Sequence, residues 1–223
     1  MAQKVEITAA DGHAFEAWRS DPAGAAKGGV VVLHAIYGLT SHIGDVCDKW
    51  AGDGYVAIAP ALYDRIERGV VFNYDAEGGE AGIAQYDKLS KQQILADVAA
   101  CSAATGEGIP KIISGFCTGG TWSWISSAEL PFDAQVNFYG SHVVQNINVK
   151  PKCPTIMHYG DSDHIVDVPG IEQIKAAHPG VDVQVYAGAG HAFFNPEQSR
   201  YSAESSSKAW KNSMAFLDRV LGG

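Results

Sequence analysis

The chain has 223 residues, of which 46% are hydrophobic and 18% are charged, and its formal net charge is −9. This composition supplies a large apolar core and fits one α/β domain of roughly 200–250 residues, so we expect a single domain over residues 1–223. The acidic balance, without a basic cluster, argues against nucleic acid and against an anionic membrane as partners.

The N-terminal residues and the cysteines of the chain carry no targeting or disulfide signal. The first residues lack an apolar signal segment, and no stretch of the sequence is apolar over a length that would span a bilayer. The four cysteines are far apart and form neither a C-x-x-C pair nor a metal-ligand spacing. We therefore expect free thiols, a cytoplasmic location and no cofactor.

The predicted elements alternate along the chain. Residues 5–9 and 14–19 flank Asp11-Gly12 and predict a β-hairpin. The apolar runs behind it predict strands at residues 29–34, 56–59, 109–113, 134–139, 155–159 and 181–186. Helical patterns occupy residues 41–53, 85–105, 121–128, 169–178 and 203–221, whereas residues 63–86 read as a long irregular excursion.

This order predicts the fold class. Strands that alternate with helices call for an α/β fold with a mostly parallel, doubly wound sheet and right-handed crossovers. The hairpin adds an antiparallel start, and the sequence leaves no room for a large cap domain. In such sheets the functional loops follow the carboxyl ends of the strands.

The hexapeptide GFCTGG at residues 115–120 is the most informative motif. It stands between a predicted strand and a predicted helix, and its G-x-C-x-G pattern is that of the nucleophile elbow of α/β-hydrolases, with cysteine in place of serine. The glycines permit the strained turn, and the helix N-terminus lowers the cost of a thiolate at Cys117. The alternative is a glycine-rich turn with a buried structural cysteine.

Two further loops supply a base and an acid. His191 follows the strand at residues 181–186 within a run of small residues, so its imidazole can reach over the sheet edge. Asp163 follows the strand at residues 155–159, and its carboxylate can accept the Nδ1 proton of that imidazole. Nucleophile, acid and histidine then occur in the α/β-hydrolase order. Asp161 is the second candidate for the acid, although a turn-forming or helper role suits it better.

The remaining parts of such a site are predicted by position. The backbone N–H groups of Thr118, next to the nucleophile, and of Ile36, after the strand at residues 29–34, are the expected oxyanion donors. His158, Asp161, Asp163 and His164 could suggest a metal cluster, but alternation along the strand separates their side chains and no zinc spacing supports it. We therefore expect no metal.

Nearly the whole chain resembles the dienelactone hydrolase family, the carboxymethylenebutenolidase-like α/β-hydrolases. The matching segments are residues 34–39 (HAIYGL), 54–60 (GYVAIAP), 62–65 (LYDR), 115–120 (GFCTGG), 139–140 (YG), 160–164 (GDSDH) and 190–193 (GHAF). The resemblance implies a Cys117–His191–Asp163 triad that cleaves a small ester or lactone without a cofactor.

Two departures from the family pattern bear on the substrate. Ala35 stands where well-studied members have a glutamate that helps to deprotonate the cysteine. Asn195 stands where they place an arginine for the substrate carboxylate, which leaves Arg65 or Arg68 as candidates for that role. We expect a less charged pocket, lined by Tyr37, Tyr63, Phe193 and Phe194.

Two other functions remain compatible with these residues. A thioester hydrolase would use the same triad and differ only in its pocket. A catalytically idle hydrolase scaffold could instead bind a small ligand, and the missing glutamate keeps this reading open. The only partner that the sequence predicts is a small-molecule ester or lactone, and a monomer is favoured slightly over an oligomer.

Overall fold

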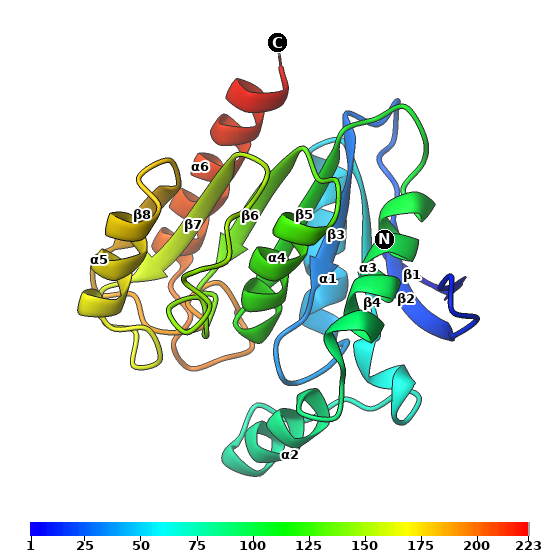
Figure 1. The fold of residues 1–223 in the computed structure, drawn as a ribbon, viewed down its shortest axis with the longest axis horizontal. Helices are drawn as coiled ribbons and strands as arrows, with labels where there is room; N and C mark the ends of the chain where they lie inside the picture. The colour runs from blue at the N-terminus through cyan, green and yellow to red at the C-terminus, as the bar shows by residue number, and fades with distance from the viewer. Residues whose placement is uncertain (223) are drawn as a thin grey trace. The chain divides into compact units, whose positions relative to one another are not determined.

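The computed structural model describes residues 1–222, which form two compact units divided between Ile112 and Ile113. Each unit contains strands with helices on both sides (Figure 1). Within the described residues, no helix is long and apolar enough to cross a membrane. The expectation of a single domain stays a prediction.

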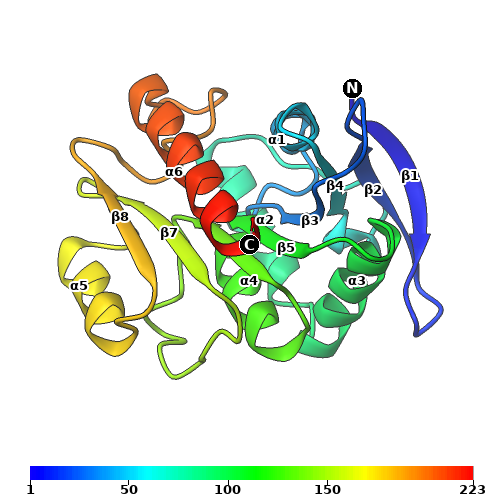
Figure 2. The ribbon, with the colours of Figure 1, turned by 90° about the horizontal axis from the view of Figure 1, so that it is seen from above.

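The first unit is built on four strands in the order β1-β2-β4-β3. They are β1 (Gln3–Thr8), β2 (Ala14–Ser20), β3 (Gly28–Leu33) and β4 (Tyr55–Pro60). β1 and β2 form the predicted antiparallel hairpin, and β3 pairs with β4 in parallel. Every residue of β3 and β4 is buried, because α1 (Ser41–Gly52) and α3 (Lys91–Ala104) cover opposite faces of these strands (Figure 2).

The excursion after β4 is more regular than the sequence predicts. It contains the short 3-10 helix η1 (Leu62–Arg65) and the helix α2 (Ala76–Tyr86). The glycines of α2 weaken its helical signal. Its first turn is capped by Asp75, whose carboxylate accepts from the N–H of Gly78 at 2.7 Å. The predicted helix over residues 85–105 is also wrong at its start, since a capping box formed by Ser90 and Gln93 begins α3 at Lys91.

The second unit carries the strands β5 (Lys111–Phe116), β6 (Ala134–Phe138), β7 (Thr155–Gly160) and β8 (Asp182–Tyr186), in that order. β6, β7 and β8 pair in parallel. The helices α4 (Thr118–Glu129) and α5 (Val168–Ala177) lie on one face of these strands and α6 (Ala203–Leu221) lies on the other (Figure 2). Mostly parallel strands with helices on both faces confirm the predicted α/β fold class.

Candidate active site

Cys117 lies in the turn between β5 and α4. Its φ of 56° and ψ of −120° are strained for a residue with a side chain. The turn is held on both sides: the N–H of Cys117 donates to the carbonyl of Phe138 at 3.1 Å, and its carbonyl accepts from the N–H of Ser141 at 3.2 Å. A Cβ at Gly115 would overlap the carbonyl of Gly119, so the elbow needs that glycine.

The structure brings the predicted base and acid together within the second unit. Nδ1 of His191 donates to Oδ2 of Asp163 at 2.8 Å, and both side chains are buried. The other carboxylate oxygen of Asp163 accepts from the N–H groups of Ile165 at 2.7 Å and Val166 at 3.1 Å. These two backbone bonds hold the carboxylate of Asp163 in place independently of its bond to His191, as an orienting acid requires.

Charge pairing, rather than burial, sets the protonation states of the three groups. Burial alone would raise the pKa of the Cys117 thiol, but the charge of His191 and hydrogen bonds from Thr118 hold it below its ordinary value. Burial opposes a charge on His191 as well, yet Cys117 and Asp163 raise the pKa of its imidazole. Burial also opposes the charge of Asp163, whose pKa is lowered by His191 and the two N–H groups. The arrangement favours a thiolate–imidazolium pair.

Nε2 of His191 is the atom that would exchange a proton with a substrate. It is buried, and among residues 1–222 it has no hydrogen-bond partner of regular geometry. Its interaction with the sulfur of Cys117 is therefore mainly one of charge, although this pairing is close enough to shift both pKa values. This atom remains available for a leaving group or a water molecule.

Backbone strain gathers at the same corner. Among residues 1–222, positive φ angles outside glycine occur at Cys117 (56°), Tyr139 (41°) and Ala192 (63°). Ala192 directly follows His191, and the ring of Tyr139 lies 5.1 Å from the imidazole of His191 between centroids. Strained residues cluster at functional sites, where the surrounding structure holds them in place. The backbone therefore marks this corner independently of side-chain chemistry.

Cys117 differs from the other three cysteines in exposure and charge. Its side chain is half-buried, whereas Cys47, Cys101 and Cys153 are buried. Burial and neighbouring carboxylates raise the pKa of the Cys47 and Cys101 thiols, and raise that of Cys153 to about 12. Only one of the four thiols therefore lies in surroundings that favour its reactive form.

The predicted substrate residues of the first unit are held by protein contacts. The guanidinium of Arg65 pairs with Asp97 at 2.7 Å and Asp11 at 2.8 Å, and its side chain is 6% exposed. The buried hydroxyl of Tyr63 donates to the carbonyl of Ile36 at 2.7 Å. Tyr37 is half-buried and contacts the ring of Tyr74 edge-on at 4.6 Å. Of these three side chains, that of Tyr37 is the most accessible to solvent.

In the second unit, Phe193 lies in the core between the rings of Tyr139 and Tyr186, at 5.4 and 5.3 Å, and is 0% exposed. Its side chain therefore has a packing role and does not reach solvent. Asn195 is 4% exposed, and its Oδ1 accepts from the N–H of Glu197 at 2.9 Å. Thr118 N–H contacts the thiol and lowers its pKa, as an adjacent backbone donor should. The oxyanion roles of Thr118 and Ile36 stay predictions.

Sequence reasoning missed Arg200. The structure places its methylene stem against Gly190, the residue before His191, with Arg200 Cδ 3.1 Å from the position of a Cβ there. Its charge, after burial, contributes to a lowered pKa at His164, whose ring meets that of His191 edge-on at 6.0 Å. The other arginines form ion pairs with carboxylates, but Arg200 forms none with the described residues. No spacing in the sequence indicates this approach, because the stem reaches back across a loop.

Residues 1–222 contain no cluster of metal-ligating side chains. His158, one of the residues of the imagined metal cluster, is buried and bonded to the hydroxyls of Tyr186 and Ser213, each at 2.8 Å.

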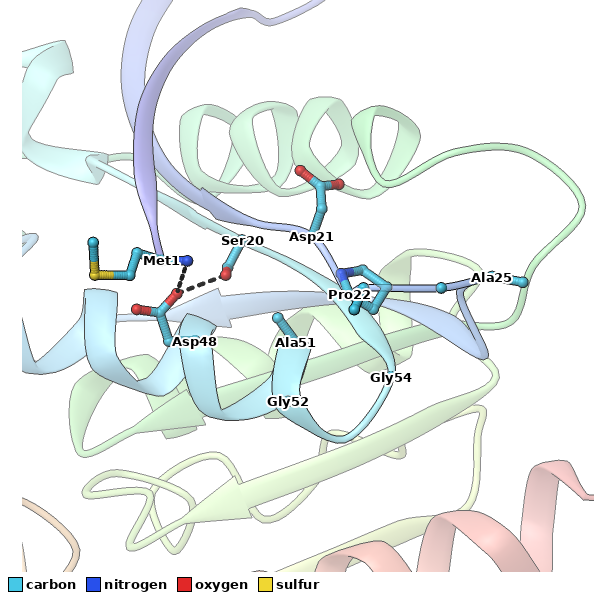
Figure 3. A pocket seen from close by; sticks show the side chains of 11 residues that line it. Met1, Ser20, Asp21, Pro22, Ala25, Asp48, Ala51, Gly52 and Gly54 are labelled. Atoms are coloured by element: carbon cyan, nitrogen blue, oxygen red, sulfur yellow. Dashed lines mark hydrogen bonds and ion pairs between the residues drawn. The ribbon is translucent and has the colours of Figure 1, made fainter.

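A hollow of about 510 Å³ lies in the first unit, where β2 ends and β4 begins (Figure 3). There Asp48 accepts from the Ser20 hydroxyl at 2.6 Å and pairs with the Met1 ammonium at 3.5 Å. This hollow lies away from the carboxyl end of β4, where catalytic loops are expected.

Comparisons with known proteins establish the family. The model of the dienelactone hydrolase family matches residues 15–221, so the chain belongs to this family, within the α/β-hydrolase superfamily. A protein of Synechocystis, provisionally named carboxymethylenebutenolidase, is 34% identical over 82% of both chains. The carboxymethylenebutenolidase of Pseudomonas putida is 25% identical over 97% of this chain and 96% of its own.

Solved structures agree with this assignment. The crystal structure of a candidate dienelactone hydrolase from Klebsiella pneumoniae superposes with a TM-score of 0.86 and 25% identity, over 98% of both chains. A dienelactone hydrolase-like promiscuous phosphotriesterase from metagenomic libraries shares the fold at a TM-score of 0.78 and 18% identity, over 99% of this chain and 98% of its own. The predicted family and enzyme class, an ester or lactone hydrolase, are therefore confirmed at the level of the family.

Proposed function

We propose that this protein hydrolyses a small carboxylic ester or lactone with Cys117 as nucleophile, His191 as acid and base, and Asp163 as the group that orients His191. The observation that carries the proposal is the charge pairing at the elbow. The pKa of the thiol is lowered and that of the imidazole is raised, while Asp163 holds the far side of the ring at 2.8 Å. The relatives that are named carboxymethylenebutenolidases support a lactone as substrate.

The reaction follows from these positions. The thiolate of Cys117 attacks the carbonyl carbon, and charge develops on the carbonyl oxygen, where the N–H of Thr118 would stabilise it. When the C–O bond breaks, Nε2 of His191 gives its proton to the leaving alkoxide, which stays tethered if the substrate is a lactone. Water then attacks the thioester, Nε2 accepts its proton, and the thiolate leaves.

The absence of the family glutamate at Ala35 does not remove the means of ionising the thiol. The charge of His191 and the hydrogen bonds from Thr118 already lower the pKa of Cys117 against the cost of burial. In this proposal the thiolate exists before the substrate binds, and no further carboxylate has to remove its proton. This argues against the idle scaffold, in which nothing would select for a strained, charged thiol.

An acylation experiment tests the proposal. Wild type and Cys117→Ala are mixed with p-nitrophenyl acetate, p-nitrophenol release is followed, and the quenched proteins are weighed by mass spectrometry. We expect turnover and an acetyl adduct mapped to Cys117 in wild type, and neither in the variant. Cys153→Ala is the matched control and should behave as wild type. Turnover by Cys117→Ala at the wild-type rate, or an adduct on another residue, would overturn the proposal.

A further inference from the structure

The acid and the base of the triad come from different loops, after β7 and after β8, so their distance depends on how these loops are joined. Among residues 1–222, three hydrogen bonds besides the His191–Asp163 bond join them. The N–H of Asp161 donates to the carbonyl of Tyr186 at 3.1 Å, and the N–H of Ser162 donates to the carbonyl of Ala189 at 3.0 Å. The third runs from the N–H of Gly188 to Oδ1 of Asp161 at 2.7 Å.

The backbone of both loops is shaped for this contact. A Cβ at Gly160 would overlap the carbonyl of Ala189, so the loops can approach only because residue 160 is glycine. Gly188 adopts a φ of +71°, which turns its N–H towards the carboxylate of Asp161. Two of the three bonds use backbone atoms alone. Asp161 supplies the only side chain among these three bonds. The residue that it holds, Gly188, lies three residues before His191 in the sequence and 27 residues after Asp161.

The hydrogen bonds of Asp161 go to the two loops and not to the side chains of the triad. The charges named first for the pKa shift of His191 are those of Cys117 and Asp163, and for that of Asp163 it is the charge of His191. The carboxylate of Asp161 accepts two hydrogen bonds at one oxygen, from Gly188 N–H and from the Ser162 hydroxyl at 3.0 Å. Its contribution to the site is therefore one of geometry.

We propose that Asp161 is a positioning residue that holds the His191 loop against the Asp163 loop by accepting the N–H of Gly188. This inference rests on the proposed function and adds to it a residue outside the triad. The positioning role requires a hydrogen-bond acceptor where Oδ1 of Asp161 lies, and it does not require a negative charge on that side chain. Because a small displacement of catalytic groups costs up to about 100-fold in rate, and this bond is exposed to solvent, we expect an effect of roughly 10-fold on kcat.

Three substitutions separate geometry from charge. Asp161→Asn keeps an acceptor oxygen and removes the charge, so kcat should stay within about 3-fold of wild type. Asp161→Glu keeps the charge and displaces the acceptor, and Asp161→Ala removes both, so each should lower kcat roughly 10-fold with little change in KM. Ser162→Ala, which leaves the Gly188 bond in place, is the matched control and should behave as wild type.

The downfield proton resonance of His191 Nδ1–H provides a readout other than rate. We expect it to be retained in Asp161→Asn and to shift or broaden in Asp161→Glu and Asp161→Ala, at unchanged thermal unfolding midpoints. Loss of activity in Asp161→Asn with full activity in Asp161→Glu would overturn the inference, because it would make the charge the active feature. Failure of the proposed function is distinct, since it would show as an acyl adduct missing from Cys117 in wild type.

Discussion

The second unit contains two buried histidines that differ in their partners. His158 is bonded on both ring nitrogens to neutral hydroxyls, those of Tyr186 and Ser213, and burial lowers its pKa to about 3. His191 is also buried, but its partners Asp163 and Cys117 can both carry negative charge, and its pKa is raised. Burial penalises the charged form in both places, so the difference comes from the partners.

This comparison explains why only one of these histidines can serve as an acid and base. The hydroxyl of Ser213 donates to the carbonyl of Ala209 at 2.8 Å, so it accepts from Nε2–H of His158, and Nδ1 accepts from Tyr186. Both ring nitrogens of His158, a residue of β7, are thus used in hydrogen bonds, one to β8 and one to α6. Nε2 of His191 carries no such commitment within the described residues. Charged partners and an available nitrogen are the two features that the proposed catalytic role of His191 requires.

The largest expected effect comes from removing the charged partner of His191. Asp163→Asn should lower kcat by roughly 10⁴-fold, the loss observed for the corresponding change in the reference serine protease, because the amide favours the wrong tautomer of the imidazole. Steady-state kinetics with p-nitrophenyl acetate would measure it. His158→Gln, a change at the neutral site, should lower kcat less than about 10-fold. Equal losses at the two sites would remove the distinction between them.

The reactivity of the four thiols tests whether the charged partners of His191 include a reactive Cys117. Substoichiometric iodoacetamide should alkylate Cys117 at least roughly 100-fold faster than Cys47, Cys101 or Cys153, because it is half-buried with a lowered pKa and they are buried with raised ones. Peptide mapping by mass spectrometry gives the four rates. Loss of activity through alkylation of another cysteine, with Cys117 intact, would contradict the assignment.

The pH dependence of this labelling should follow the sign of the shifts. The pKa of Cys117 is lowered, so the thiolate is present above that value and the alkylation rate falls only as the pH drops through it. Asp163→Asn withdraws one of the groups that raise the pKa of His191, which weakens the imidazolium beside the sulfur. We expect the midpoint of the rate profile to rise by about one pH unit in this variant, a tenfold change at fixed pH. An unchanged midpoint would show that Asp163 does not support the charge pair.

The parts of the fold that the sequence predicts well are those that depend on local pattern. The last helix, α6, was predicted at its true bounds, and the strands β5 to β8 within a few residues, because apolar runs and periodicity are local signals. The glycines of α2 hide a helix that forms where Gly82 meets the carbonyl of Ile36. That contact joins segments far apart in the chain, and no local pattern contains it.

The candidate site shows the same limit. The order of Cys117, Asp163 and His191, each after its own strand, was enough to predict that they come together. The sequence predicts Phe193 as a pocket residue, but its side chain is buried in the core. An aromatic residue near the proposed catalytic histidine is equally compatible with either place, so the sequence could not decide between them. The bond from Gly188 to Asp161 and the approach of Arg200 to Gly190 depend on loop conformation, which sequence pattern does not set.

The smallest effect concerns the charge of the substrate. The two arginines that the sequence offers as carboxylate anchors are paired within the protein, Arg65 with Asp97 and Asp11, and Arg68 with Glu6. We therefore expect a neutral ester to be preferred over its free acid, by roughly 5-fold in kcat/KM, since an exposed charge interaction is worth about 1 kcal/mol. A dienelactone and its methyl ester form the matched pair of substrates.

A substitution at Arg200 tests whether this residue binds the carboxylate of the substrate. The methylene stem of Arg200 packs against Gly190 and its side chain is exposed, so Arg200→Ala should change the ratio of the two kcat/KM values by less than about 2-fold. Arg219→Ala, which removes an equal charge from an arginine paired with Asp182 on the far end of α6, is the control. If wild type instead prefers the free acid, and Arg200→Ala alone abolishes that preference, then neutral selectivity is wrong. Arg200 would then be the anchor that Asn195 cannot provide, because an amide can hydrogen-bond a carboxylate but cannot neutralise it.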